Sequence, residues 1–586
     1  MAPLPNLDRH VRIGDALSGD DIRTGRVAGV AGIARLRARY ARAVGVRKRT
    51  LARALDRAER SAAIATLDRR CAAITEARRD ILVAARGCDL FGGRGTPTTG
   101  MRTTLAELRA DLRAVRRHRK ALIGGAALPF SFATHFADVA ASGGFDVIVG
   151  NPPWVRVHRI PAAARAGLRR GYVSYRAAAW RDGAVAAGAG IGFAGQVDLA
   201  ALFVERSLAV TRADGVVALL LPAKLWRSLA GGGIRRLLDA DHRVMALEDW
   251  SNAPALFDAA VYPSLLVVRR GRAAADVPSP DARLTVHAPR VAIAWSMHAS
   301  ELALDPSPGA PWLMLPPPVR RAFDAMRAAG TALGTSRFGA PMLGVKCGCN
   351  GAFVVRAQSD ARLSSENGNT LDIEPEMLRP LIRGEHVTPW RVEINGERLI
   401  WTHGTDGQPL DRLPPRTERW MRGWRRRLLA RSDARGASRW WGVFRTEAAA
   451  CDVARVVWAD FGRSLRAAVL MPGDSAVPLN TCYAVRCPDP RDAFALVTVL
   501  NSPLASAWLG SVAEPARGGY RRFLGWTLAL LPLPEQWERA RELLVGVGER
   551  AVGGDPPGAS DLLEVVTRAY GLRASTVRAL LDWDIR

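Results

Sequence analysis

The sequence predicts an α/β protein: a doubly wound sheet, interrupted by a helical insertion and followed by an α+β region. Three observations support this prediction. An apolar, β-branched run at 145–149 indicates a buried strand that stops at Gly150 and leads into a polar turn. Helix-like and strand-like segments alternate between 198 and 268. Between 33 and 123, apolar residues recur at helical spacing with arginines between them.

Composition and charge limit the classes of protein that fit. The 586 residues suffice for about three or four domains, and 48% hydrophobic content is enough for sizeable cores. The formal net charge of +27 comes almost wholly from arginine and indicates a polyanionic partner, although a GC-rich genome also raises arginine content. Nucleic acid is therefore the expected partner.

The cysteines and the apolar runs suggest where the protein works. Seven cysteines are scattered, and only Cys347 and Cys349 lie close together, without a second pair at zinc-like spacing. We expect a reduced protein without a structural metal. The first residues lack the layout of a signal peptide, and no apolar run approaches ~18 residues. The prediction is a cytoplasmic protein without a membrane segment.

The turn after the buried strand, Asn151-Pro152-Pro153-Trp154, carries the most specific chemistry in the chain. The side-chain carbonyl of Asn151 and the backbone carbonyl of Pro152 are two acceptors, and proline restricts the backbone that holds them. Such a pair would grip a planar amino group and leave its nitrogen lone pair free to attack an electrophilic methyl. Trp154 offers a flat face worth roughly 1–3 kcal/mol to a stacked base. The structural alternative is a proline-stiffened turn with an aromatic plug.

Residues Gly150 to Trp154 resemble the catalytic motif of amino-group DNA methyltransferases, in the Asn-Pro-Pro-aromatic form typical of adenine enzymes. The resemblance implies a class I, Rossmann-like methyltransferase sheet. It also implies S-adenosylmethionine as cofactor and methyl transfer to N6 of adenine in double-stranded DNA. The target base must leave the duplex, because the reacting atom is buried there.

The chain begins with residues 1–32, which we interpret as the start of the methyltransferase domain. Val11 and Ile13 suggest a short strand with Gly14 and Asp15 at its end. The resemblance implies that Asp15 accepts a hydrogen bond from the amino group of the cofactor adenine. In isolation, an aspartate in a strand-end turn explains the residue equally well.

Residues 33–125 form the predicted helical insertion, with two or three antiparallel helices. A glycine-rich stretch at 87–95 joins them as a flexible connector, because it lacks the Gly-Lys-Ser/Thr sequence of a phosphate-binding loop. The arginine faces of these helices suit contact with a DNA backbone, and they suit a solvated surface at least as well.

Residues 126–304 hold the rest of the predicted catalytic domain. After the turn, the pattern predicts an amphipathic helix at 198–210 and strands at 215–221, 244–250 and 261–268, with a further helix at 235–238. Phe257, just before the last strand, lies where the resemblance places a second aromatic against the flipped adenine. A phenylalanine of the core is the alternative reading.

A proline-rich linker is expected at 305–318, and a target-recognition domain at 319–535. Tryptophans and arginines alternate in that domain, which suits DNA contact, although many of the tryptophans must fill its core. Its resemblance to the target-recognition region of large restriction-modification methyltransferases rests on five short segments in the expected order: 344–353, 381–384, 480–483, 500–502 and 520–523. A C-terminal helical segment, 536–586, follows.

One expected part is missing from the sequence. The family carries an acidic, glycine-rich turn for the cofactor ahead of the Asp15-type motif, and none precedes Gly14. In the family's strand order, 3-2-1-4-5-7-6, the strand ending at Asp15 would be the third and the strand ending at Gly150 the fourth. The absent first and second strands would leave the edge at Val147 unpaired. We therefore expect either a split enzyme, with its N-terminal half in another polypeptide, or a truncated product.

The sequence as a whole predicts the C-terminal part of a type IIG-like N6-adenine DNA methyltransferase from a restriction-modification or phage-defence system. The expected partners are double-stranded DNA and an N-terminal methyltransferase half or another defence-system subunit. One alternative is a catalytically inactive DNA-binding or specificity subunit. The other is an RNA or protein-glutamine methyltransferase, since Asn-Pro-Pro turns also serve those reactions.

Overall fold

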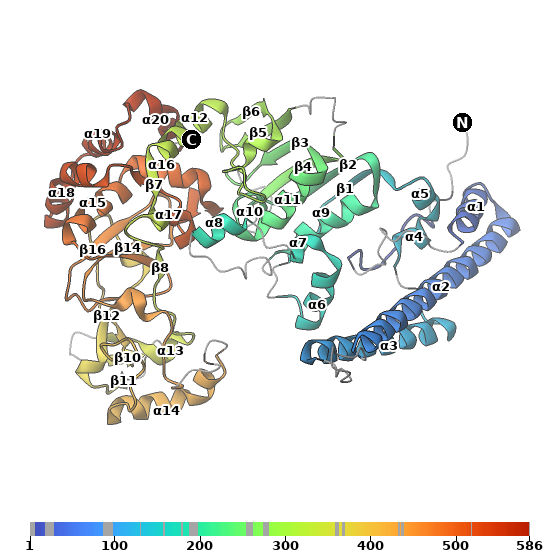
Figure 1. Ribbon diagram of the computed structural model, residues 1–586, viewed down its shortest axis with the longest axis horizontal. Helices are drawn as coiled ribbons and strands as arrows, with labels where there is room; N and C mark the ends of the chain where they lie inside the picture. The colour runs from blue at the N-terminus through green and yellow to red at the C-terminus, as the bar shows by residue number, and fades with distance from the viewer. Residues whose placement is uncertain are drawn as a thin grey trace, which may run out of the picture.

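The computed structural model has three parts that follow one another along the chain (Figure 1). A helical part comes first, a mixed sheet with its helices lies in the middle, and a larger α+β part comes last. The structure describes residues 6, 8–17, 29–85, 98–128, 130–155, 159–176, 180–186, 197–253, 262–272, 281–357, 363–365, 368, 370–431, 434, 439–516 and 519–584.

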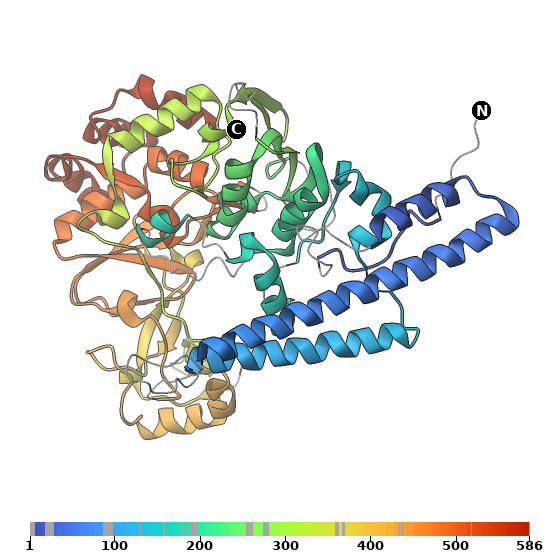
Figure 2. The same ribbon diagram turned by 45° about the vertical axis from the view of Figure 1, so that its right-hand side comes forward.

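Two long helices form an antiparallel hairpin that extends from the middle part (Figure 2). α2 (Gly45–Ala85) has 41 residues and α3 (Thr99–Ile123) has 25. Arg60 of α2 donates to the backbone carbonyl of Leu122 of α3 at 2.7 Å, and Leu67 packs in the same small core. α1 (Val30–Ala41) lies against the first half of α2. The helices predicted for this region are confirmed.

The residues before α1 form an irregular segment, 8–17, and the strand predicted around Val11 and Ile13 is wrong. The side chains of Val11 and Ile13 are 79% and 98% exposed, so neither packs into a sheet. Arg12 instead donates to the buried carboxylate of Glu59 in α2 at 2.7 Å. Two β-branched residues are too short a pattern to establish a strand.

The described residues of the middle part form a sheet of six strands: β1 (Phe145–Gly150), β2 (Thr211–Pro222), β3 (His242–Asp249), β4 (Pro263–Arg270), β5 (Ala282–His287) and β6 (Ala292–Met297). Their spatial order is β1-β2-β4-β3-β5-β6. β1 is parallel to β2 and β3 is parallel to β5, while the other neighbours are antiparallel. The strands predicted after the turn are present, and the hairpin of β5 and β6 is an addition that the sequence analysis did not anticipate.

Helices cover the face of the sheet that carries Ile148 and Val217. α9 (Leu199–Val210) and α11 (Gly232–Asp241) pack on this face and share its core. Nine of the twelve residues of α9 are buried, so the prediction of an amphipathic helix here is wrong. A helix that is buried on all sides is surrounded by protein, and α9 lies between the sheet and the short helices beyond it.

The opposite face is open at β1. Side chains alternate across a strand, so Val147 and Val149 point away from Ile148. They are 58% and 78% exposed. β1 is also the terminal strand of the sheet as far as the described residues go, so its second edge has no strand beside it there. An apolar face and a free edge therefore meet at the strand that precedes the Asn-Pro-Pro-Trp turn.

Short helices connect these elements: α4 (Phe132–His135), α5 (Ala137–Ala141), α6 (Ala162–Gly171), α7 (Val173–Arg176), α8 (Arg181–Ala186) and α10 (Lys224–Arg227). α4 and α5 lie between the hairpin and β1, and α6 to α8 follow the turn (Figure 1). No helix was predicted for the segment that contains α6, α7 and α8.

Arg235 of α11 joins the middle part to the chain that follows. Its guanidinium is buried, and it donates hydrogen bonds to four backbone carbonyls, those of Leu225, Ser228, Gly309 and Ala310. Burial lowers the pKa of Arg235 to about 9, which keeps it charged at neutral pH. Trp226 and Trp312 stack beside it with ring centroids 5.5 Å apart. The chain around Trp312 is thus packed firmly against the middle part.

The strands described in the C-terminal part form sheets ordered β11-β10-β9-β13-β12-β17, β16-β14-β18-β8, β15-β20-β19 and β21-β7. Its strands are β7 (Gly330–Ala332), β8 (Met342–Leu343), β9 (Val354–Ala357), β10 (Leu363–Ser365), β11 (Thr370–Leu371), β12 (Leu378–Ile382), β13 (Glu397–Ile400), β14 (Ala454–Ala459), β15 (Phe461–Gly462), β16 (Ala467–Leu470), β17 (Val477–Pro478), β18 (Cys482–Cys487), β19 (Glu514–Ala516), β20 (Tyr520–Arg522) and β21 (Pro532–Pro534).

The helices of this part are α12 (Pro317–Ala328), α13 (Asn350–Phe353), α14 (Pro415–Leu429), α15 (Pro490–Leu500), α16 (Pro503–Val512), α17 (Gly525–Ala529), α18 (Trp537–Gly553), α19 (Ala559–Ala569) and α20 (Ala574–Asp584). α15 and α16 lie in the largest core, where Phe323 stacks on Trp508 at 4.6 Å. Of the helices described, none is by itself long and apolar enough to span a membrane; α15 and α16 meet that test of length and composition only as a pair bent by 68°.

Two buried histidines make the fold sensitive to mild acid. Burial lowers the pKa of His135 and of His403 to about 4, below the ordinary value of 6.5. The unfolded chain therefore takes up protons at these sites below pH 6.5, while the folded chain does so only below pH 4. Their contribution to stability is complete above pH 6.5 and is lost as the pH falls through this window.

We expect the free energy of unfolding to fall by about 1–2 kcal/mol for each of His135 and His403 between pH 7 and pH 5. Chemical denaturation at the two pH values measures the change. His403→Gln should reduce the pH dependence, because glutamine does not titrate. An unchanged difference between pH 7 and pH 5 in this variant would show that His403 does not titrate on unfolding.

Candidate active site

The Asn-Pro-Pro-Trp turn lies at the carboxyl end of β1, beside the carboxyl end of β2. Gly150 pairs with Leu219 in the parallel ladder, so Asn151 emerges from the sheet level with the last residues of β2. The side chain of Asn151 is exposed, Pro152 is buried and Pro153 is exposed. The parallel pairing of β1 thus presents the amide at the edge where α/β sheets bind ligands.

Trp154 and the residue after it fix the turn to its neighbours. The indole Nε1 of Trp154 donates to the backbone carbonyl of Leu220 at 3.4 Å, and its ring packs partly into the core. The backbone carbonyl of Val155 accepts a hydrogen bond from the backbone N–H of Leu199 at 3.1 Å, at the start of α9. The turn is therefore held from both sides, while the amide of Asn151 stays accessible.

An ion pair that the sequence analysis missed lies next to this turn. Lys224 of α10 contacts Asp198 at 2.6 Å, and the Asp198 side chain is only 5% exposed. Asp198 directly precedes α9, and Lys224 follows the end of β2. Its place in the sequence could have identified Lys224 as a site residue. Lys224 follows the end of a predicted buried strand, as Asn151 does. The pair adds a cation and a carboxylate to the same edge of the sheet.

The C-terminal part reaches this edge through β19. Burial raises the pKa of Glu514, and the nearby cations Arg522 and Lys224 act against the rise. β19 packs on α10, which carries Lys224. The neighbouring strands β15 and β20 carry an exposed aromatic pair, Phe461 and Tyr520, stacked at 4.8 Å. Tyr520 begins one of the short segments identified in the sequence, whereas Phe461 was missed.

Asp15 lies in the irregular segment that precedes α1. Its carboxylate accepts a hydrogen bond from the backbone N–H of Leu17 at 2.9 Å, and the hydroxyl of Tyr172 donates to the carbonyl of Leu17 at 2.8 Å. Burial raises the pKa of Tyr172 to about 12, and the carboxylates of Glu205 and Asp15 add to the rise. The carbonyl of the next residue, Ala16, accepts a hydrogen bond from Arg206, which places Asp15 beside α9.

Phe257 lies outside the described residues, as do its neighbours in 254–261.

The six cysteines that the structure describes are free thiols, and burial raises the pKa of Cys347 to about 12. Within the described ranges, no three histidine, cysteine or carboxylate side chains are grouped so that they could hold a metal ion.

Comparison with known proteins adds an independent line of evidence. Residues 115–257 match the family model described as Eco57I restriction-modification methylase. The chain is 25% identical over 456 residues to the type II methyltransferase M.PaeR7I of Pseudomonas aeruginosa, covering 73% of this chain and 71% of that protein. It is 22% identical over 456 residues to the type II methyltransferase M.XhoI of Xanthomonas vasicola, covering 73% and 75%.

Among solved structures, the chain is similar in fold to the type IIL restriction-modification enzyme MmeI, which was determined in complex with DNA. The TM-score is 0.52 and the sequence identity 12%, and the match covers 83% of this chain. The chain spans 65% of the length of that enzyme. Together, the family match and the two relatives support a DNA methyltransferase of the restriction-modification kind.

Proposed function

We propose that this chain carries the catalytic turn and the target-recognition region of an adenine-specific DNA methyltransferase. The methyl group would pass from S-adenosylmethionine to N6 of adenine in double-stranded DNA, within a cytoplasmic restriction-modification or phage-defence system. One observation carries the proposal. The Asn-Pro-Pro-Trp turn lies at the carboxyl end of β1, inside the segment 115–257 that matches a restriction-modification methylase.

In this proposal, Asn151 and Pro152 hold the amino group of the target adenine. The Asn151 side-chain carbonyl and the Pro152 backbone carbonyl each accept one of its two hydrogens, and Pro153 restricts the backbone between them and Trp154. The nitrogen lone pair is then free for transfer. Trp154, anchored through its Nε1, stacks on the base, and Phe257 is the proposed second aromatic.

S-Adenosylmethionine would supply an electrophilic methyl on a sulfonium ion. The described residues at the end of β1 form one wall of a site for this cofactor and do not enclose it. The reason is that β1 has an open edge there, and Val147 and Val149 are exposed on the adjoining face. The described residues alone therefore do not fit the whole cofactor. Asp15 is the proposed contact to its adenine.

We propose further that another polypeptide completes the sheet beside β1, either an N-terminal methyltransferase half or another subunit of the defence system. The order β1-β2-β4-β3 agrees with strands 4-5-7-6 of the family, whose fourth strand has a neighbour on both sides. Unpaired backbone groups at an edge that also exposes two valines form a template for an added strand.

The domain assignment is part of the same proposal: residues 1–32 begin the methyltransferase domain, 33–125 are the helical insertion, 126–304 the catalytic domain, 305–318 the linker, 319–535 the target-recognition domain and 536–586 the C-terminal helical segment. The exposed pair Phe461 and Tyr520, with Arg463 at 5.5 Å from the Tyr520 ring, is a proposed DNA contact of the C-terminal part.

A labelled S-adenosylmethionine transfer assay on mixed duplex DNA tests the proposal. The chain would be assayed alone and together with the polypeptide encoded directly upstream. We expect transfer to N6 of adenine only in the mixture. Val149→Asp should prevent transfer in the mixture by placing a charge on the exposed face of β1. Val291→Asp is the matched control, since Val291 is also an exposed valine of the same part, outside β1.

Other outcomes of the transfer assay would support the alternative functions. Duplex binding without transfer in any mixture would indicate a catalytically inactive DNA-binding or specificity subunit. Modification of RNA or of protein glutamine, with no modified duplex, would assign the turn to those substrates. Transfer by the chain alone would refute the proposal of a second polypeptide and leave the proposed reaction intact.

A further inference from the structure

One flank of α3 carries a row of cations that the proposed catalytic site does not use. Six exposed residues form this α3 stripe: Arg102, Arg109, Arg113, Arg116, Arg117 and Lys120. Their spacings are mostly three, four or seven residues, which places them on one side of a helix. At 1.5 Å per residue, the stripe extends for ~27 Å along the helix axis. This length equals the rise of about eight base pairs of duplex DNA.

The signs of the charges are segregated around α3. Glu107 and Asp111 are four residues apart and lie on the flank opposite the stripe. Within the described part of the chain, no carboxylate forms an ion pair with any residue of the stripe. Arg119, which is not in the stripe, pairs with Asp68 of α2. The cations that face α2 are therefore neutralised, and those of the stripe are not.

The exposed charges of α2 show what an ordinary solvated helix face looks like in this protein. Asp56, Asp68 and Asp80 lie beside arginines there, and each forms an ion pair, with Arg9, Arg119 and Arg79 in turn. If a GC-rich genome alone explained the arginines, cations and acids would be mixed on both α2 and α3. The α3 stripe is thus a separate feature of the hairpin.

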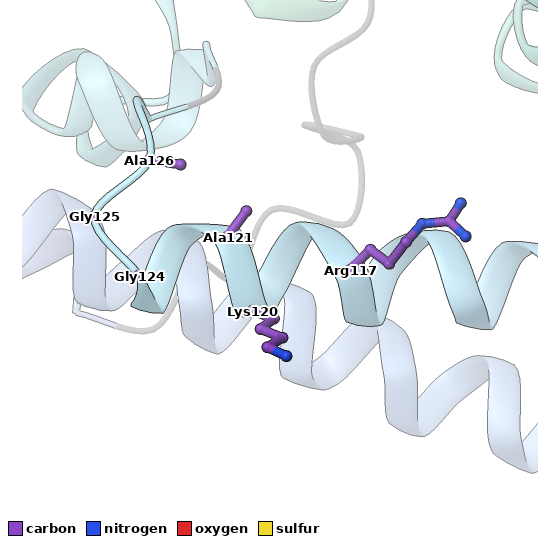
Figure 3. A pocket seen from close by; sticks show the side chains of 6 residues that line it. All are labelled: Arg117, Lys120, Ala121, Gly124, Gly125 and Ala126. Atoms are coloured by element: carbon purple, nitrogen blue, oxygen red, sulfur yellow. The ribbon is translucent and has the colours of Figure 1, made fainter.

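The stripe is held on a rigid support. Three leucines and Val115 on the inner side of α3 are buried, and Arg60 of α2 donates to the last turn of α3 at Leu122 and to Ala126 beyond it. At this end, a shallow hollow is lined by Arg117, Lys120 and the chain from Gly124 to Ala126 (Figure 3). The two cationic side chains extend from successive turns of α3.

The hairpin and the lobe that carries α14 extend to the same side of the sheet in both views (Figures 1 and 2). α14 also exposes arginines, among them Arg425, Arg426 and Arg427. The turn at Asn151 belongs to the sheet of the middle part, which lies between the hairpin and the C-terminal part that carries the α14 lobe. A long polyanion bound to the α14 lobe and to the turn would therefore have the hairpin as its second cationic neighbour.

We propose that the α3 stripe binds the phosphate backbone of duplex DNA, as a second arm opposite the α14 lobe. The inference rests on the proposed function, because it takes the duplex of that function as the ligand. Phosphates are the complementary ligand for a row of cations that form no ion pair within the described part of the chain and have no acid on their flank of α3. Contacts of this kind position the duplex and carry no base sequence.

The salt dependence of duplex binding tests the proposal. Each lost phosphate contact lowers the slope of log K against log salt by about 0.9. The stripe variant replaces Arg109, Arg113, Arg116 and Lys120 by glutamine in the full-length chain. We expect its slope to be smaller by up to about 3.6, equally for duplexes of different sequence. The matched control replaces Arg47, Arg49, Arg53 and Arg57 of α2, four exposed arginines of the same hairpin.

The expected result is a reduced slope in the stripe variant and an unchanged slope in the control, with equal melting temperatures. Equal slopes in all three proteins, or equal reductions in both variants, would overturn the proposal. So would an absence of duplex binding by the unmodified chain. The transfer assay reports separately on the proposed function. A stripe-dependent slope without methyl transfer would refute that function alone, and methyl transfer with equal slopes would refute the stripe alone.

Discussion

Replacing Asn151 by alanine is expected to reduce methyl transfer in the active mixture by at least about 100-fold, the usual loss when one positioned hydrogen-bonding group of a reacting centre is removed. Duplex binding should persist, because Asn151 is one exposed side chain at the end of β1 and supports no other contact in the described structure. The labelled transfer assay measures the first effect and a binding titration the second.

Two further variants make this result specific. Asn151→Asp keeps an acceptor oxygen at the same place, and it should retain more transfer than Asn151→Ala. Gln536→Ala removes another exposed amide, one that makes no capping hydrogen bond at the start of α18, and it should leave transfer unchanged. Normal transfer by Asn151→Ala would exclude the turn as the holder of the amino group.

Replacing Arg235 by alanine is expected to lower the free energy of unfolding by about 3–5 kcal/mol. The buried guanidinium donates to the backbone carbonyls of α10 and of the chain near Gly309, and alanine leaves these carbonyls without donors. Chemical denaturation followed by tryptophan fluorescence measures the loss, since Trp226 and Trp312 stack beside the site.

Arg236→Ala is the control for this prediction, because Arg236 is the exposed neighbour on the same helix. Its substitution should change stability by less than about 0.5 kcal/mol. A similar small effect of Arg235→Ala would mean that water replaces the guanidinium and that the joint between α11 and Gly309 is open to solvent.

The sequence was informative where the pattern was local and repeated. The helices of the hairpin follow from leucines at helical spacing, such as Leu105 and Leu112, and these are buried as expected. The strands at β2, β3 and β4 follow from long apolar runs. The turn at Asn151 could be predicted to end a strand, because Gly150 and two prolines stop the apolar run that precedes it.

Features that depend on distant partners could not be predicted. α9 seemed amphipathic because its own sequence contains Glu205 and Arg206, yet both side chains are buried. Glu205 accepts hydrogen bonds from the backbone of residues 173 and 174, and Arg206 donates to the carbonyl of Ala16. The position of Asp15 depends on the same contacts. No local pattern reports that these segments meet.

The contact between Arg206 and Ala16 has a consequence for the order of folding during synthesis. Closing a loop of 190 residues costs on the order of 5 kcal/mol of chain entropy, so this contact forms only when many others form with it. The hairpin needs residues no further along than 126, and it can fold as soon as these leave the ribosome. The segment at 8–17 therefore gains its partners on α9 late, after Tyr172 and Arg206 have been made.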